Sequence, residues 1–263
     1  MSSRRNRIAD RVFKLWAIGC TLIGIIMLGI FLVNIAIDGL GRIDWEFITS
    51  LPSRKAEKAG IYVALLGTVW ILVLTAIIAI PVGVAAGIYL EEYGKKSRFA
   101  SILEINITNL AGVPSIIYGI LGLEVFVRTF GLGKSVIAGA LTLSLLILPI
   151  IIVATREALK AVPKTLREAS FALGATKWQT VSKQVLPAAS GGIVTGVILA
   201  ISRAIGETAP LILVGAIVYL NKPPQTPLDQ YSVLPMQIFN WISRPEQEFS
   251  VNAAAAIIIL LLV

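Results

Sequence analysis

Uncharged stretches long enough to cross a lipid bilayer recur along this chain of 263 residues. A helix of about 20 apolar residues crosses the hydrocarbon core, and helices satisfy their own backbone hydrogen bonds there. Hydrophobic residues make up 56% of the chain and charged residues 14%, which differs strongly from a soluble domain. We therefore predict an all-α membrane protein. The runs are Leu15–Ile37, Ile61–Leu90, Ile105–Leu123, Ser135–Thr155 and Ala188–Leu220.

A sixth apolar segment, Phe249–Val263, closes the sequence. At about 1.5 Å per residue it would reach only roughly 22 Å, so we expect a sixth span whose end is missing, with a short interfacial segment as the alternative. The expected organisation is a cytoplasmic N-terminus, 1–14, followed by a transmembrane domain, 15–263. Its spans are predicted at about 15–37, 61–90, 100–127, 135–155, 188–220 and 250–263, with a cytoplasmic loop at 156–187.

The distribution of basic residues predicts which ends of these spans face the cytoplasm. With the N-terminus inside, the three cytoplasmic segments carry 14 Lys and Arg residues against 8 in the three outer segments, as the positive-inside rule requires. The first run is too long for a signal peptide and lacks a cleavage site, which favours an uncleaved anchor in a prokaryotic plasma membrane. The excess of basic residues is therefore explained by the orientation of the spans in the bilayer. The sequence contains no soluble domain with a basic face of the kind that binds nucleic acid.

The cytoplasmic loop contains a polar island, Lys160–Pro187, with two helix-start patterns. Thr165-x-x-Glu168 and Thr176-x-x-Gln179 each fit a capping box, and Gly174 lies between them, where a left-handed residue would end the first helix. A helix-turn-helix of this kind inside the loop of a membrane protein predicts a docking site for a cytoplasmic partner.

Catalytic residues are scarce. The chain has no histidine, so a Ser-His pair and an imidazole base are both excluded. The stretch Gly131–Ser135 resembles the end of a P-loop, but Arg128 stands where that motif needs its first glycine. A lone cysteine, Cys20, excludes an internal disulfide. We expect no enzyme activity and no cofactor in this chain, and we expect partner ATPase subunits to bind ATP and magnesium.

Two charged residues interrupt the fifth run. Arg203 would lie about 22 Å into a helix that begins at Ala188, and Glu207 follows four residues later on the same face. Ionisable groups at this depth are costly and face a cavity or each other. One interpretation is a structural ion pair. The other is an anion pathway, because an arginine offers a permanent charge and a fork of donors to an oxyanion.

The polar island resembles the coupling loop of ABC-importer permeases. The matching residues are Glu168-Ala169-Ser170, Gly174 and Leu186-Pro187, with Ser170 and Gln184 departing from the usual pattern. In that family the loop forms coupling helices that sit in a cleft of the ATPase subunit, and Trp178 falls in the second of them. The resemblance implies a six-span ABC-importer permease bundle.

More specific stretches resemble the PstA-type permease of the phosphate-specific ABC importer. That resemblance implies a second permease of the PstC type, two ATPase subunits and an external phosphate-binding protein. It also assigns Arg203, Glu207 and the adjacent Thr208 to the phosphate pathway. The stretches are Asp44–Phe47, Gly112–Gly119, Ser202–Pro210 and Leu234–Ile238.

Two other functions fit the same residues. A permease for another oxyanion, such as phosphonate, molybdate or sulfate, would share the loop and the arginine, and a membrane scaffold or sensor would use the loop alone. The outer segment Asn221–Ser250 also has two interpretations. Three prolines predict extended chain. The residues that follow at helical spacing predict a half-buried helix at the membrane surface: Leu234, Ile238, Trp241 and Ile242. This interfacial helix would be either a gate or landing site for the binding protein, or a simple anchor.

Overall fold

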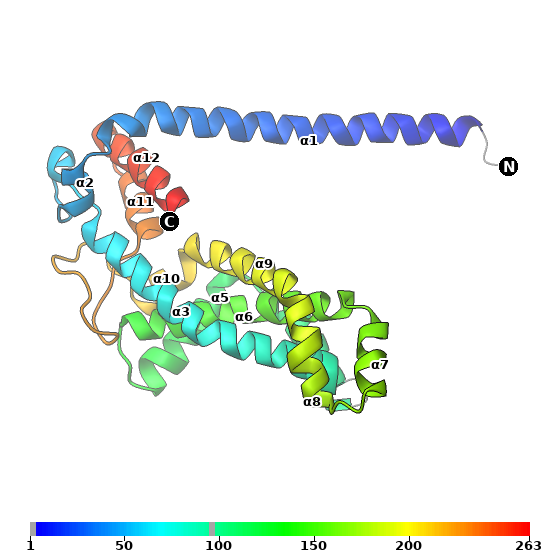
Figure 1. The fold of residues 1–263 in the computed structure, drawn as a ribbon. Coiled ribbons are helices and arrows are strands. Elements are labelled where there is room, and N and C mark those ends of the chain that lie inside the picture. The colour runs from blue at the N-terminus through cyan, green and yellow to red at the C-terminus, as the bar shows by residue number, and fades with distance from the viewer. Residues whose placement is uncertain (1–3, 95–97) are drawn as a thin grey trace.

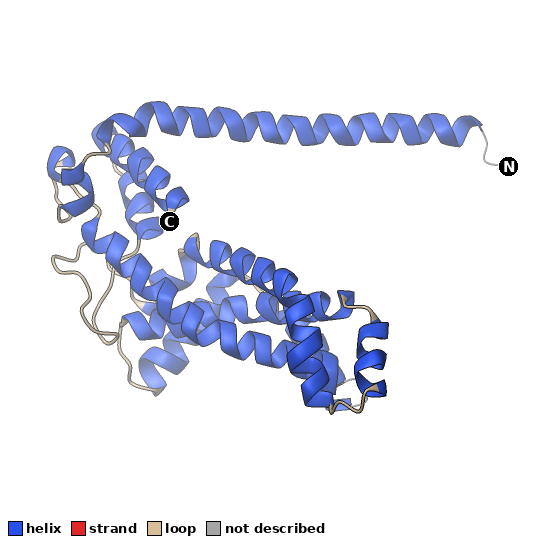
Figure 2. Ribbon diagram, viewed as in Figure 1, coloured by secondary structure: helices blue, strands red, loops and turns tan. Residues whose placement is uncertain are grey.

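The computed structural model describes residues 4–94 and 98–263, and all regular structure within them is helical (Figures 1 and 2). Three π-helical segments, η3 (Tyr89–Tyr93), η4 (Leu123–Thr129) and η5 (Val181–Val185), directly continue α3, α5 and α8. Two 3₁₀ turns are η1 (Leu40–Arg42) and η2 (Ala56–Lys58). The α-helices are α1 (Arg4–Gly39), α2 (Trp45–Thr49), α3 (Tyr62–Ile88), α4 (Arg98–Leu110), α5 (Ser115–Gly122), α6 (Val136–Ala161), α7 (Lys164–Ala172), α8 (Lys177–Thr180), α9 (Leu186–Ile205), α10 (Ala209–Val214), α11 (Leu234–Ile242) and α12 (Gln247–Leu262).

Helix α6 is the centre of the bundle, between α3 and α9. Glycines on both neighbours let the backbones approach closely, as small residues do between membrane helices. A Cβ atom at Gly83 would lie 2.7 Å from Ile151 Cγ2, and one at Gly87 would lie 2.7 Å from Thr155 Cβ. On α9, a Cβ at Gly192 would lie 2.8 Å from Ala158 Cβ. These glycines of α3 and α9 therefore lie on the helix faces that pack against α6.

Helix α1 projects away from the rest of the chain (Figure 1). Its side chains from 10 to 34 are almost all exposed, and only its last turns pack against the rest of the chain. A Cβ atom at Gly39 would lie 2.7 Å from the backbone of Ala254 in α12, and Arg42 Nε donates to Asn252 Oδ1 at 3.0 Å. The first and last helices are thus fastened together at one end of α1.

Four helical stretches in the described part of the chain are long and apolar enough to span a membrane. A fifth span exists if the pair Ala100–Leu110 and Ser115–Thr129, bent by 109°, counts as one. The predicted run 100–127 is therefore broken, since Pro114 follows a residue biased away from the helical region. Helix α12, with 16 residues, is shorter than these. The membrane boundaries themselves remain a prediction.

The predicted run 188–220 also differs from the structure. Helix begins at Lys177, passes through η5 and Pro187 without interruption, and ends at Ile205. Pro187 lies where the π-helical segment η5 passes into α9, so its missing N–H group falls where the backbone hydrogen-bond pattern already changes. Beyond Ile205 only the six-residue α10 is helical before the chain turns at Gly215, whose φ is 108°. The apolar sequence thus continues to Leu220, whereas the long helix ends at Ile205.

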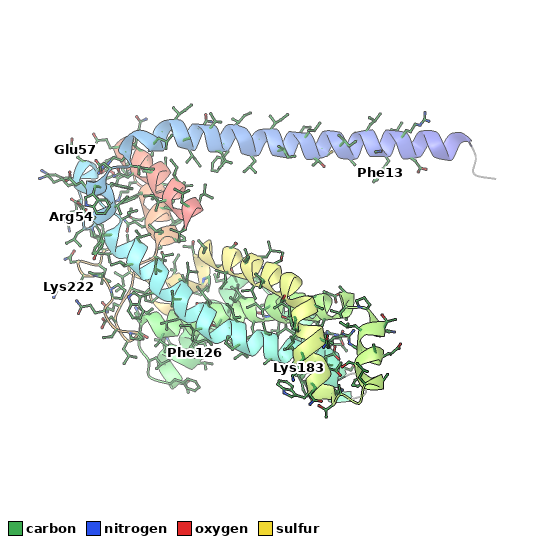
Figure 3. The ribbon with its side chains drawn as sticks, viewed as in Figure 1. Phe13, Arg54, Glu57, Phe126, Lys183 and Lys222 are labelled. Atoms are coloured by element: carbon green, nitrogen blue, oxygen red, sulfur yellow. The ribbon has the colours of Figure 1, made fainter. Side chains whose placement is uncertain are left out.

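The segment that follows α10 crosses the N-terminal ends of α3 and α6. Val136 N donates to Asp229 O at 3.0 Å, and Ile137 N donates to Pro227 O at 2.9 Å. The chain then enters α11, where Leu234, Ile238 and Trp241 are buried. This confirms the predicted helix, although Ile242, which we expected on the same face, is 58% exposed. Lys222 in this segment and Lys183 in η5 lie at opposite ends of the bundle (Figure 3).

Candidate functional site

The sequence-predicted pathway residues lie where α9 stops. Arg203 is in the last turn of α9, and Gly206 N donates back to Arg203 O at 3.3 Å to end the helix. Glu207 and Thr208 form the link to α10. Arg203 Nε lies 3.4 Å from Glu207 Oε1, with the two side chains 47% and 16% exposed. An ion pair thus spans the break, and about half of the arginine side chain is left exposed by this chain.

This position differs from the one expected. An arginine in mid-helix would have helical backbone on both sides, whereas Arg203 is followed within three residues by non-helical chain. At a helix end the last carbonyl groups lack partners within the helix, so a cation there is favoured by the helix dipole. The same break leaves polar backbone next to the arginine, which is tolerated in membrane proteins where the chain lines a cavity or is covered by protein.

A second helix break lies beside the first. Residues 111–114 separate α4 from α5, and Tyr118 of α5 donates across the bend to Leu110 O at 2.8 Å. Tyr118 packs in one apolar cluster with Ala200 and Ala204 of α9. A Cβ atom at Gly119 would lie 2.7 Å from Pro210 Cα in α10. The Gly112–Gly119 stretch thus packs against the Arg203 break, a juxtaposition that no local sequence signal gives.

The polar island forms the expected helix-turn-helix, with one of its two predicted capping boxes. Thr176 and Gln179 make the reciprocal capping box, and Gly174 has the predicted left-handed backbone, with φ of 80°. The Thr165–Glu168 box is wrong. Helix α7 begins two residues earlier than that box requires, at Lys164, with Pro163 at its N-cap and no side-chain cap. Thr165 is therefore already inside the helix, because Pro163 sets the start.

The predicted coupling residues form an open surface at this end of the bundle. Glu168, Ala169, Gly174, Trp178 and Pro187 are exposed, and Ser170 and Leu186 are half-buried. The departure at Ser170 has a structural role, because its hydroxyl lies 2.8 Å from Thr180 Oγ1 and joins α7 to α8.

Large apolar side chains are also exposed on this surface. Phe171 is 48% exposed, Trp178 64% and Leu173 89%. Single exposed apolar residues are ordinary, but three within eight positions of a polar loop are typical of a binding surface.

Behind this surface, ion pairs connect elements far apart in the sequence. Arg167 of α7 binds Glu92 of η3 at 2.7 Å, and Arg156 of α6 binds Glu104 of α4 at 2.8 Å. Arg167, Arg156 and Glu104 line a cavity of about 850 Å³. Sequence reasoning missed Arg167 and Glu92, since 75 positions separate them and no short motif relates them.

Residues 79–263 match the family described as binding-protein-dependent transport system inner membrane component. The chain is 35% identical to the probable ABC transporter permease protein YqgI of Bacillus subtilis, covering 94% of this chain and 81% of that protein. It is 33% identical to the phosphate transport system permease protein PstA of Yersinia pestis, covering 100% and 90%. For PstA 1 of Mycobacterium tuberculosis, strain H37Rv, the identity is 38%, covering 81% and 68%. These matches confirm the resemblance to PstA permeases.

A solved structure gives the same fold. The inward-facing MetNI methionine ABC transporter superposes with a TM-score of 0.58 at 20% identity, covering 77% of this chain and 91% of that one. The helical bundle, the coupling-type loop and the sequence matches agree. The chain therefore belongs to the ABC permease family of binding-protein-dependent transport system inner membrane components.

Proposed function

We propose that this chain is the permease subunit through which an ATP-driven importer moves inorganic phosphate across a prokaryotic plasma membrane. The observation that carries the proposal is Arg203, a permanent cation at a helix break that this subunit leaves 47% exposed. The similarity to PstA permeases over the whole chain supports phosphate as the cargo.

Arg203, Glu207 and Thr208 have distinct roles in this proposal. The guanidinium group of Arg203 donates a fork of hydrogen bonds to the tetrahedral anion. Glu207 neutralises the arginine when no anion is present, so that an isolated charge is never left in a dry pathway. Thr208 adds a hydroxyl two positions after the helix-ending glycine, close to the same break.

The energy comes from partner subunits. We propose two ATPase subunits that bind ATP and magnesium and dock on Glu168, Ala169, Ser170, Gly174, Trp178, Leu186 and Pro187. A second permease of the PstC type completes the pathway, and an external phosphate-binding protein delivers the cargo. The permease itself catalyses no reaction and holds no cofactor. This arrangement requires the N-terminus and residues 156–187 in the cytoplasm, as the basic residues indicate.

The docking surface and the pathway lie on connected elements. Helix runs without interruption from Lys177 to Ile205. The same helix therefore begins in the coupling loop and carries Arg203 in its last turn. Movement of α8 against an ATPase would therefore displace the helix end that carries the cation. In the proposed cycle, ATP binding opens the pathway outward, phosphate passes to Arg203, and hydrolysis returns the pathway inward.

Uptake of labelled phosphate by the assembled, ATPase-competent complex tests the pathway. Arg203→Gln should lower uptake roughly 10- to 150-fold, because a hydrogen bond to a charged group contributes about 1.5–3 kcal/mol. Arg128→Gln is the matched control, since Arg128 and Glu124 form another i,i+4 pair, at 2.9 Å, with both side chains more than 60% exposed. Unchanged uptake in Arg203→Gln would remove Arg203 from the pathway.

The same assay separates the other functions. Competition by unlabelled phosphate, but not by sulfate, molybdate or phosphonate, is expected if phosphate is the cargo. Inhibition by one of the other anions instead would reassign the cargo within the oxyanion class. A scaffold or sensor would co-purify with ATPase subunits without ATP-dependent uptake, and it would not need Arg203.

A further inference from the structure

We propose that the ion pair between Arg167 and Glu92 transmits movement of the coupling loop to α3. In this inference, the coupling loop displaces η3, the π-helical segment that continues α3 at its C-terminal end. Arg167 and Glu92 are positioning residues, since neither would touch the ATPase nucleotide or the cargo. The inference rests on the proposed ATP-driven function. It adds a non-covalent connection from the coupling loop to α3, beside the peptide chain that joins the loop to α6 and α9.

Arg167 uses its whole guanidinium group within the subunit. Its Nε and Nη2 donate to Glu92 Oε1 at 3.2 and 2.7 Å. Its Nη1 donates to Val162 O at 2.8 Å, and Nη2 also donates to Leu159 O at 2.9 Å. One side chain on α7 therefore holds the C-terminal end of α6 and the end of α3 together.

The pair is covered by protein, although it lies beside an open surface. The side chains are 16% exposed for Arg167 and 8% for Glu92. A buried ion pair adds little net stability over an apolar replacement, but removing one partner is costly because it leaves an uncompensated charge. Such a contact is suited to holding α7 in one register against η3.

The second coupling helix holds the same five-residue segment. Lys177 Nζ lies 4.5 Å from the centre of the Tyr93 ring, a cation–π contact with η3 at the start of α8. The hydroxyls of Ser170 and Thr180, 2.8 Å apart, join α7 to α8. Both coupling helices therefore contact η3, and each also contacts the other.

Helix α3 then connects this end of the bundle with the opposite one. Helix is continuous from Tyr62 to Tyr93, which at about 1.5 Å per residue is roughly 48 Å. Near its far end, Thr68 Oγ1 accepts a hydrogen bond from Leu234 N at 2.9 Å, where the outer segment enters α11. In this inference, displacement of η3 reaches the outer segment through one continuous helix, the kind of secondary element that can carry coupling between distant sites.

The test compares Glu92→Gln with Glu157→Gln in the assembled complex. Glu157 pairs with Lys160 within α6, and both side chains are exposed, so it is a matched control that connects no separate elements. We expect Glu92→Gln to lower phosphate imported per ATP hydrolysed by roughly 2- to 30-fold, the range for coupling networks. ATPase co-purification and hydrolysis should persist. Glu157→Gln should match the parent.

A double variant separates transmission through the pair from general damage. If Arg167 and Glu92 act through each other, Arg167→Gln with Glu92→Gln should be no worse than the worse single variant. Additive losses, or an unchanged import ratio in Glu92→Gln, would overturn the inference.

A readout without cargo separates this inference from the phosphate proposal. In a Cys20→Ser background, Thr208→Cys reports opening of the pathway by its reaction with a membrane-impermeant thiol reagent. ATP should change this rate in the parent complex, and Glu92→Gln should abolish the change. If the ATP response depends on Glu92 but phosphate is not imported, the cargo proposal fails and the link stands. An ATP response that survives in Glu92→Gln excludes the link.

Discussion

Replacing Gly174 is the most specific perturbation of the coupling loop, because the turn needs glycine there only for its left-handed backbone conformation. Its φ is 80°, and a Cβ atom would meet nothing within 4 Å. Gly174→Ala therefore adds no clash and costs only the left-handed backbone penalty of about 1–2 kcal/mol. This variant keeps the N–H group that donates to Phe171 O at 2.9 Å.

Gly174→Pro does more. The proline ring fixes φ near −65° and removes the N–H group. It also disfavours the bridge-region backbone of Leu173, whose φ and ψ are −84° and 8°, because a residue before proline prefers an extended conformation. Backbone strain of about 1–3 kcal/mol and a lost hydrogen bond of about 0.5–1.5 kcal/mol together give roughly 1.5–4.5 kcal/mol. The population of the native turn should fall by about 10- to 1,600-fold, at tenfold per 1.4 kcal/mol.

The assay measures membrane insertion, ATPase co-purification and phosphate imported per ATP hydrolysed. Because Gly174 lies outside the predicted spans, insertion should be unchanged in both variants. Import should decrease in the order Gly, Ala, Pro, and the Pro variant should lose either ATPase binding or coupling. If Gly174→Pro imports phosphate as well as the parent, the left-handed turn does not position the docking helices, and the reasoning is refuted.

Two further predictions concern the outer end of the bundle. A Cβ atom at Gly67 would overlap the carbonyl oxygen of Ser232, so Gly67→Ala should destabilise the packing of the outer segment by about 1–3 kcal/mol; Gly24→Ala, with nothing within 4 Å, is the control. Thermal unfolding in detergent measures both, and equal stability would contradict the overlap. Backbone N–H groups at 225 and 226, then the Thr226 hydroxyl, hold the pKa of Asp229 below its ordinary value. Their contribution is therefore present above the unfolded pKa, about 3.9, and lost as pH falls through the lower folded pKa. Asp229→Asn should loosen this turn at neutral pH, seen as faster proteolysis, and a rate equal to the parent would count against the cap.

The sequence was sufficient for features that depend on local composition and backbone chemistry. Apolar length predicted a helical membrane protein, and the Thr176–Gln179 capping box and left-handed Gly174 were confirmed. Each of these depends on residues within a few positions of one another, so periodicity and residue type carry the information.

Tertiary structure decided where helices stop and which charges meet. An apolar run predicts that a segment is buried, but it does not require helix, so the end of α9 at Ile205 was not predicted. Arg203 therefore lies at a helix end instead of at mid-span. The pairing of Arg167 with Glu92 likewise depends on α7 folding back against the end of α3. Residue type gives a charge its sign and its need for a partner, whereas only the packing of distant helices determines which partner it finds.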